Sequence, residues 1–348
     1  MSNSDASPKI LLVKLSSLGD VLHNLPIVWD IRNRLPNAQI DWVVEEAYVH
    51  LLTPLLSKDG FRGIDRIIPF GLRRWKKSFL SKKSWSEFFA FKKDLQAVSY
   101  DVIIETQGLL KSALVCALAK KGSDAVVSGI ANATQFSGYE PVARLFYNQS
   151  VHVPWQCHAV DRSRHIACSA LNWPLIGRNE LTQFYPSAYL EKISAQAFPE
   201  LKQPYILFFH STAREAKRWD NANWIELGKI LAGLGYQIVL PWGSKSEKDV
   251  SEELASQIPG SIVPNAFSIE KAFSVIAHAA LIVGVDTGLT HLAAVLDKPT
   301  VELYCDSPRW KTEGYWSDKI RNIGDMYQPP TSIEALSVST ELLNATKN

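Results

Sequence analysis

The stretch KLSSLGDV, residues 14–21, places an acid, Asp20, directly after the single glycine of a turn that follows the apolar run ILLV. An apolar strand, a small-residue turn and a helix start are typical of nucleotide-binding α/β folds, whose first turn usually approaches a phosphate. A carboxylate is unsuited to that task. The residues alone leave two interpretations open: Asp20 caps the following helix, or it is an ionised base that accepts a proton.

A second stretch, VGVDTGLTH at residues 283–291, has the composition of a strand, a turn and a helix start. Asp286 or Thr287 can cap the helix, while backbone N–H groups from Thr287 and Gly288 onward face an anion. His291 follows one turn later and could donate to a phosphate. The alternative is a plain capping turn with a structural histidine.

A third stretch, HSTAREAKRW at residues 210–219, follows the apolar run YILFF and combines the hydroxyl of Thr212 with the cation Lys217. Such a pair suits a diphosphate, with lysine acting as a compact point charge. A solvated basic loop is the alternative. Two anion-binding patterns after two different strands in the same half of the chain favour a phosphate site there.

Residues 73–93 (RRWKKSFLSKKSWSEFFAFKK) concentrate positive charge. They hold eight Lys and Arg against one acid, Glu87, a local charge of 8 − 1 = +7, while the whole chain has a net charge of +2. Tryptophans and phenylalanines lie between the cations, which suits an anionic amphiphile or an anionic membrane face. The alternative is a solvated helix with an apolar inner face. No nucleic-acid-binding module surrounds the stretch.

Several well-known patterns are missing from the sequence. It has no P-loop and no G-x-S-x-G, and the G-x-G at Gly233 lacks the third glycine of a dinucleotide fingerprint. No Asp-x-Asp pair is present to clamp a metal–diphosphate. These absences argue against an NAD oxidoreductase and against a metal requirement. The following residues match no zinc-ligand spacing: His152, Cys157, His158, His165 and Cys168.

The elements that must position these side chains alternate between apolar runs and amphipathic segments, which predicts an α/β protein with two doubly wound sheets in tandem. Ligands of such sheets bind outside the carboxyl ends of the strands. A Trp/Pro/Asn-bearing region, residues 172–203, predicts a linker. The expected strands are 9–14, 39–45, 65–69, 101–105, 125–130, 205–209, 236–241, 280–285 and 299–304; the expected helices are 21–35, 85–98, 109–120, 223–233, 246–257, 268–278 and 288–296.

The overall composition is that of an ordinary globular protein. The chain has 348 residues, of which 46% are hydrophobic and 21% charged, and no apolar run approaches the roughly 20 residues that span a bilayer. Its four cysteines have no paired spacing, which indicates free thiols in a reducing cytosol.

The order of the motifs resembles the bacterial heptosyltransferases of lipopolysaccharide core assembly, glycosyltransferase family nine. The matching stretches are KLSSLGDVLHNLP, IDWVVEE, RRWKK, ETQGLLKSAL, EPVARLFYN, LPWG, VGVDTGLTHL and LDKP. The resemblance implies a GT-B fold, with two facing Rossmann-like domains and a deep cleft between them. The acceptor would bind to 1–180 and ADP-heptose to 190–330, and a C-terminal helix within 331–348 would pack back on the first domain.

The resemblance also implies an inverting transfer of L-glycero-D-manno-heptose from ADP-heptose to a Kdo residue of Kdo2-lipid A. Asp20 would be the general base, and no metal would be required. In this reaction the base takes the acceptor proton while ADP leaves from the opposite face of the sugar. Thr212, Lys217, Glu247 (at the ribose), Phe267 (at the adenine), Asp286, Thr287, Gly288 and His291 would surround the donor, and Ser17, Gly19, Arg73, Arg74, Lys76 and Gln107 the acceptor.

The implied partners are the two substrates and the inner face of the inner membrane, where a cytoplasmic monomer would bind peripherally, without nucleic acid. Stretches KLSSLGD and RRWKK favour the members that add the first heptose. The alternatives are a later-acting heptosyltransferase of the core and a non-catalytic nucleotide-sugar-binding homologue. Two positions depart from the family pattern: Ala213, where a second hydroxyl is common, and Tyr139, where an arginine is expected and Arg144 is offset.

Overall fold

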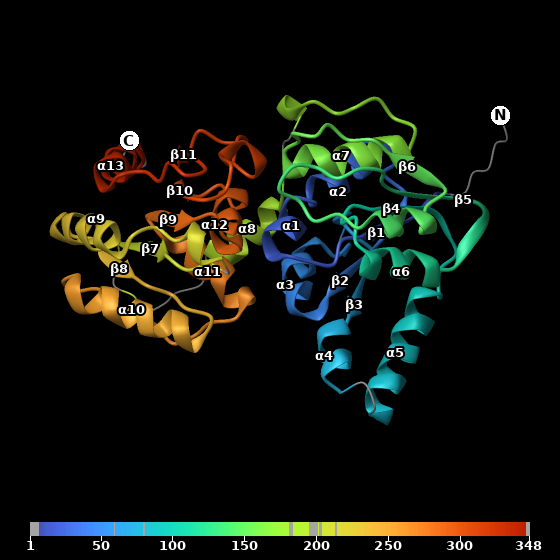
Figure 1. Cartoon of the computed structure of the whole chain (residues 1–348), viewed down its shortest axis with the longest axis horizontal. Helices are drawn as coiled ribbons and strands as arrows, with labels where there is room; N and C mark the ends of the chain where they lie inside the picture. The colour runs from blue at the N-terminus through green and yellow to red at the C-terminus, as the bar shows by residue number, and fades with distance from the viewer. Residues whose placement is uncertain are drawn as a thin grey trace. The chain divides into compact units, whose positions relative to one another are not determined.

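The computed structural model describes residues 7–58, 60–78, 81–180, 184–194, 201, 204–212 and 214–345. The chain divides into two compact units, Met1–Phe184 and Tyr185–Asn348, called here the N-terminal and C-terminal units (Figure 1). The division lies between the two domains expected at 1–180 and 190–330. Ala213, one of the two departures from the family pattern, lies outside the described residues.

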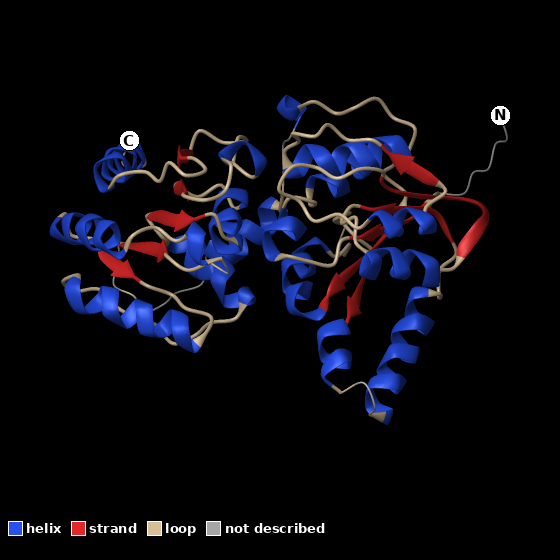
Figure 2. Ribbon diagram, in the orientation of Figure 1, coloured by secondary structure: helices blue, strands red, loops and turns tan. Residues whose placement is uncertain are grey.

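The N-terminal unit is built on a parallel sheet covered by helices (Figure 2). Its strands are β1 (Lys9–Val13), β2 (Gln39–Glu45), β3 (Arg66–Phe70), β4 (Tyr100–Glu105), β5 (Lys121–Ile130) and β6 (Gln149–Val151). Its helices are α1 (Leu18–Leu22), α2 (Pro26–Arg34), α3 (Val49–Leu52), α4 (Leu72–Lys77), α5 (Lys82–Leu95), α6 (Leu110–Leu118) and α7 (Ala159–Ala170).

The strand order of this sheet is β3-β2-β1-β4-β5-β6, and every pair is parallel. In β1, Ile10 pairs with Ile40 on one side and with Val102 on the other. The order reverses between β1 and β4, so the turns after these two strands meet at the switch point where α/β sheets bind ligands. Asp20 follows β1, and Gln107 follows β4.

The C-terminal unit repeats this architecture with fewer strands. They are β7 (Tyr205–Phe209), β8 (Gln237–Val239), β9 (Leu281–Val285), β10 (Thr300–Tyr304) and β11 (Ile320–Gly324). The helices are α8 (Ser187–Ser194), α9 (Asn221–Gly233), α10 (Lys245–Gln257), α11 (Ile269–His278), α12 (Gly288–Val295) and α13 (Ser332–Ala345). The parallel order β11-β10-β9-β7-β8 reverses between β7 and β9. Lys217 follows β7, and Asp286 follows β9.

Local sequence signals explain several of the element boundaries. The four residues after Lys9 in β1 are buried, as expected for a central strand of a parallel sheet. Helix α10 begins with a capping box, in which the Ser244 hydroxyl accepts from Glu247 N–H and the Glu247 carboxylate accepts from Ser244 N–H. Helix α9 is capped by Asp220, whose carboxylate accepts from Ala222 N–H at 2.9 Å.

The structure corrects the expected helix at 21–35. Helix α1 already begins at Leu18, and α2 begins separately at Pro26. Proline has no N–H to continue a helix but fits its first turn, so it starts a new helix here. The expected linker at 172–203 contains helix α8, whose Ile193 is buried. Strands β6 and β11 and helices α3, α4 and α7 were not predicted.

The expected C-terminal helix is present as α13, and that it also packs back on the first domain stays a prediction. Ala335, Leu342 and Leu343 of α13 lie in the hydrophobic core of the C-terminal unit. The hydroxyl of Ser332 donates to Glu226 of α9 at 2.6 Å. The apolar face of α13 therefore packs inside the C-terminal unit, where it contacts α9 and strands β9 to β11.

None of the described helices is long and apolar enough to cross a membrane. All four cysteines are free thiols, as predicted, and three of them are buried.

Candidate active site

Asp20 lies in the first turn of α1, at the switch point of the N-terminal unit. Its Oδ2 accepts from the backbone N–H of Ser17 at 3.0 Å and from the Ser17 hydroxyl at 2.8 Å. Its Oδ1 lies 3.6 Å from Lys14 Nζ and 3.9 Å from Arg162 Nη2. The side chain is still 39% exposed. Hydrogen bonds and nearby cations thus hold the carboxylate in place, while part of it remains accessible to a ligand.

The surroundings of Asp20 keep it ionised. Burial would raise the pKa of this carboxyl, but the charges of Lys14 and Arg162, together with the hydrogen bonds from Ser17, hold that pKa well below its usual range. Burial lowers the pKa of Lys14 itself to about 8, against the opposing charge of Asp20. At neutral pH the turn therefore presents a carboxylate that can accept a proton.

The turn after β4 joins the same site. Gln107 Oε1 accepts from Leu15 N–H at 2.9 Å, and Gln107 Nε2 donates to the Ser16 hydroxyl at 3.3 Å. Lys111 Nζ donates to the same Ser16 hydroxyl and to Glu45, both at 2.9 Å. Gln107 therefore positions the β1 turn. Gly19 is buried as the second residue of α1, next to Asp20.

Of the eight basic residues in 73–93, only the two arginines form ion pairs within the described part of the chain. Arg73 Nε lies 2.7 Å from Glu45 Oε2, and Arg74 forms ion pairs with Glu46 and Glu87. Among the residues that the structure describes, Lys76 has no hydrogen-bond or ion-pair partner. Most of the positive charge that the sequence concentrates here is therefore not paired with acids of the described residues, and Lys76 is available to an anionic ligand.

The aromatic residues of this stretch divide in the same way. Trp75 and Phe91 are buried and pack around Phe70. Trp85 and Phe89 on α5 are exposed, by 45% and 58%. The expectation of an apolar inner face and the expectation of an exposed aromatic surface thus each hold for part of the stretch.

Lys217, Asp286 and His291 come together at the switch point of the C-terminal unit. Lys217 Nζ forms an ion pair with Asp286 Oδ2, and His291 Nε2 contacts Asp286 Oδ1 at 2.9 Å. The other ring nitrogen of His291, Nδ1, lies 3.2 Å from Glu302 Oε1. Glu302 is fully buried and also accepts from the Tyr304 hydroxyl at 2.8 Å. The result is a continuous chain from the partly exposed Lys217 to a buried acid.

This network fixes the charge of His291. Burial would lower the pKa of the imidazole, but Glu302 and Asp286 raise it to about 10, so the ring is protonated at neutral pH. The pKa of Asp286 is well below its usual range: burial opposes this shift, and His291 and Lys217 cause it. Both ring nitrogens face carboxylates. His291 thus positions Asp286 in this structure, and its contact with a donor phosphate stays a prediction.

The N-terminus of α12 lies next to this network. Thr287 is the N-cap residue, but none of the described side chains caps the helix through a hydrogen bond to it. The carboxylate of Asp286 is directed to Lys217 and His291 instead. The N–H groups that begin at Gly288 are therefore left for an external acceptor, and the helix dipole favours an anion there.

The other expected donor residues follow neighbouring strands. Thr212 is buried shortly after β7. Glu247, after β8, accepts from Gly243 N–H at 2.7 Å and from Ser244 N–H at 3.0 Å, so part of its carboxylate is used in capping. Phe267 is half-buried in the loop before α11. Among the described residues, no hydrogen bond or ion pair joins these three to the Lys217 network.

Four residues that shape the two sites are not among those expected from the sequence. Lys14 and Arg162 set the charge of Asp20, and Glu302 and Tyr304 support His291. A signal was present for Glu302, because a charged residue inside the apolar strand TVELY needs a buried partner. Arg162 gave no signal, since it lies on α7, a helix that was not predicted. Within the described ranges, no three His, Cys, Asp or Glu side chains are grouped so that they could hold a metal ion.

Comparison with known proteins agrees with this geometry. The family profile described as glycosyltransferase family 9 (heptosyltransferase) matches residues 88–340. The chain is 35% identical over 314 residues to lipopolysaccharide heptosyltransferase 1 of Salmonella typhimurium (strain LT2), covering 90% of this chain and 93% of that protein.

Solved structures give the same result. The structure of E. coli heptosyltransferase WaaC with ADP matches with a TM-score of 0.79 and 32% identity, over 96% of this chain and 99% of that one. WaaC with ADP-2-deoxy-2-fluoro heptose matches with a TM-score of 0.72 and 33% identity, over 97% and 98%. The predicted GT-B class and the predicted enzyme class are thereby confirmed. The chain belongs to glycosyltransferase family 9, the heptosyltransferases.

Proposed function

We propose that the chain transfers L-glycero-D-manno-heptose from ADP-heptose to a Kdo residue of Kdo2-lipid A, with inversion and with Asp20 as general base. The observation that carries the proposal is the Asp20 carboxylate, which is held ionised by Lys14 and Arg162 yet is 39% exposed. The similarity to a heptosyltransferase 1 and to WaaC bound to ADP and to an ADP-heptose analogue supports the choice of substrates.

The C-terminal unit would bind the departing ADP. Lys217 supplies a partly exposed cation, and the uncapped N-terminus of α12 supplies N–H groups that suit a diphosphate. His291 and Glu302 keep Asp286 oriented behind that site. Glu247 would accept from the ribose hydroxyls, and Phe267 would stack on the adenine.

Asp20 would deprotonate the acceptor hydroxyl as the bond from heptose to ADP breaks. A base within hydrogen-bond reach typically contributes about 10²–10⁴-fold to the rate. The transition state resembles an oxocarbenium ion, and the negative charge that develops on the diphosphate is stabilised by Lys217 and the α12 N–H groups. We place no metal in this mechanism.

The acceptor carries carboxylates and phosphates on a lipid anchor, so we propose that a monomer works peripherally on the cytoplasmic face of the inner membrane. The basic stretch 73–93 supports this location, because cations near exposed aromatic rings favour an anionic lipid surface. Lys76 would contact the acceptor directly, together with Arg73 and Arg74.

The test is a turnover assay with ADP-heptose and deacylated Kdo2-lipid A, run with and without EDTA. We expect heptose transfer that is insensitive to EDTA and no transfer to an acceptor that already carries the first heptose. Transfer only to the heptosylated acceptor would identify a later-acting transferase. Binding of ADP-heptose without any transfer would identify a non-catalytic homologue.

A further inference from the structure

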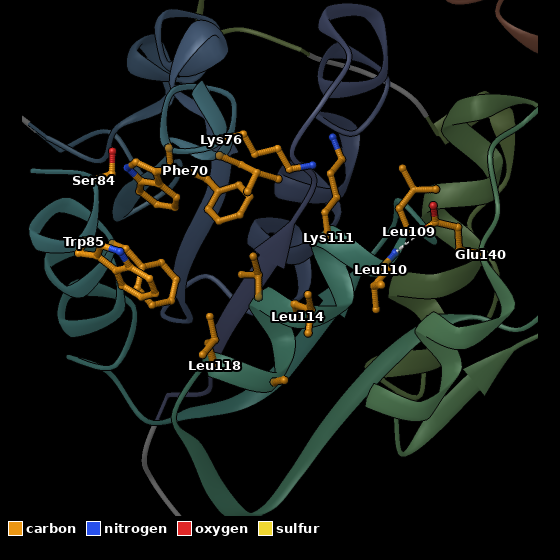
Figure 3. A pocket seen from close by; sticks show the side chains of 15 residues that line it. Phe70, Lys76, Ser84, Trp85, Leu109, Leu110, Lys111, Leu114, Leu118 and Glu140 are labelled. Atoms are coloured by element: carbon orange, nitrogen blue, oxygen red, sulfur yellow. Dashed lines mark hydrogen bonds between the residues drawn. The ribbon is translucent and has the colours of Figure 1, made fainter. Parts of the chain in front are cut away.

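The N-terminal unit contains an apolar pocket of about 880 Å³ that the proposed mechanism does not use. One wall comes from α4 and α5, with Trp75, Trp85 and Phe88, and the other from α6, with Leu110, Leu114 and Leu118 (Figure 3). The volume lies within the range of about 300–1,000 Å³ that is typical of sites for small ligands.

The pocket is open to solvent. Trp85 and Leu114 line it from opposite walls, and each is 45% exposed. Large apolar side chains that stay exposed around a hollow mark a binding site more often than an isolated surface residue does. An apolar ligand could therefore enter without unfolding the unit.

Charge is confined to a few of the lining residues. Glu140 is occupied, since its Oε2 accepts from Leu110 N–H at 2.5 Å. Lys111 and Lys76 extend toward the same edge of the pocket in Figure 3. Lys111 is held by Ser16 and Glu45, whereas Lys76 has no hydrogen-bond or ion-pair partner within the described part of the chain. The pocket thus suits a long apolar body with an anionic end.

The edge of the pocket that carries Lys76 and Lys111 is linked by hydrogen bonds to the turn that carries Asp20. Lys111 Nζ donates to the hydroxyl of Ser16, and the next residue, Ser17, donates twice to Asp20. All of these contacts lie within the N-terminal unit. A ligand with its anionic end at Lys76 would therefore have its apolar part in the pocket and its polar part directed toward Asp20.

We propose that this pocket holds one fatty acyl chain of the lipid-anchored acceptor, with Lys76 binding the anionic head group. The identity of the acceptor rests on the function proposed above. An acyl chain fits the lining better than a peptide or a nucleotide does, because the walls offer few hydrogen-bond donors and acceptors for a polar ligand.

The first test compares two water-soluble acceptors, one fully deacylated and one with a single acyl chain. We expect the wild type to have a KM about tenfold lower for the acylated acceptor, because the buried chain adds affinity. Leu114→Trp narrows the pocket and should weaken this preference without changing KM for the deacylated acceptor. Leu145→Trp, the same substitution at an 80% exposed position outside the pocket, should keep the preference.

Equal preference in the wild type and in Leu114→Trp would overturn the proposal. If Leu114→Trp instead weakened only the association with phosphatidylglycerol vesicles, the occupant would be a membrane lipid, and the proposal would be wrong on that point. If neither acceptor is turned over, the proposed function fails, and the pocket is judged by a binding measurement alone.

That measurement is a calorimetric titration with dodecyl phosphate below its micellar concentration. We expect binding to the wild type that is about tenfold weaker in Leu114→Trp and in Lys76→Met. Dodecyltrimethylammonium has the same chain and the opposite charge. It should bind to the wild type more weakly than dodecyl phosphate does. On Lys76→Met the two ligands should bind with equal affinity. Dodecyl phosphate affinity that is unaffected by Leu114→Trp would contradict the proposal.

Discussion

The two switch points of this protein occupy equivalent positions in equivalent sheets but carry opposite chemistry. In the N-terminal unit an exposed carboxylate, Asp20, stands in front of two cations, Lys14 and Arg162. In the C-terminal unit a partly exposed cation, Lys217, stands in front of two buried acids, Asp286 and Glu302. The topology fixes where a ligand can bind, and the residues after the strands decide which ligand it is.

The helices at the two switch points show how this difference arises. In helix α1 the Asp20 carboxylate accepts from the N–H and the hydroxyl of Ser17, so a carboxylate of the helix itself occupies the place of an anion. Helix α12 has a threonine at its N-cap without a side-chain hydrogen bond to the helix. Of the two helix starts, the one without an acid in its first turn is suited to bind a diphosphate.

Asp20→Asn gives the largest effect that we expect. It keeps the size of the side chain but removes the base, so kcat should fall by about 10²–10⁴-fold. Affinity for ADP, measured by calorimetry, should not change, because the diphosphate is proposed to bind at the other switch point. Ser17→Ala, which removes one hydrogen bond to the carboxylate, is the control and should cost at most about tenfold in kcat. Near-normal kcat in Asp20→Asn would remove this residue from the mechanism.

Lys217→Met should give the next largest effect. It removes the cation that is proposed to stabilise charge on ADP, and loss of such a group typically costs about 10²–10³-fold. We expect lower kcat/KM for the donor and weaker ADP binding, with KM for the acceptor unchanged, as measured by initial rates at varied concentrations of each substrate. A change in acceptor KM alone would contradict the assignment of the two switch points.

His291→Gln tests the charge of the C-terminal network through stability. The pKa of His291 is raised to about 10 from a model-compound value of 6.5, so protonated His291 stabilises the fold fully below pH 6.5, and this contribution is lost as the pH rises through 10. The difference in unfolding free energy between wild type and variant should therefore shrink by up to about 1.4 kcal/mol per pH unit over that interval. Urea unfolding at several pH values measures this difference in unfolding free energy. If the difference stays constant between pH 6.5 and 10, the ring of His291 is neutral.

Lys14→Met should have the smallest of these effects. Without this charge, the pKa of Asp20 should rise toward its ordinary value, although the carboxyl stays ionised at pH 7. We expect the acid limb of the kcat/KM profile to move to higher pH, with a loss of about tenfold or less at neutral pH. An unchanged acid limb would show that Lys14 does not set the ionisation of Asp20.

Much of this arrangement could be predicted from the sequence, because the determining signals are local. The apolar strands, the capping residues and the turns that carry Asp20 and Asp286 are each contained in a short stretch. The prediction failed where partners are distant in sequence. Arg162 reaches Asp20 from α7, and Glu302 reaches His291 from the neighbouring strand. No short stretch shows that His291 has both ring nitrogens against carboxylates, or that α13 is used by its own unit.

The most direct test is a crystal structure of the protein with an intact, non-transferable ADP-heptose analogue. The account predicts that the diphosphate lies against Lys217 and the N–H groups at the start of α12, with Asp20 free of contact to it. A diphosphate bound at the Ser16–Asp20 turn of the N-terminal unit would contradict the assignment of base and donor site to different switch points.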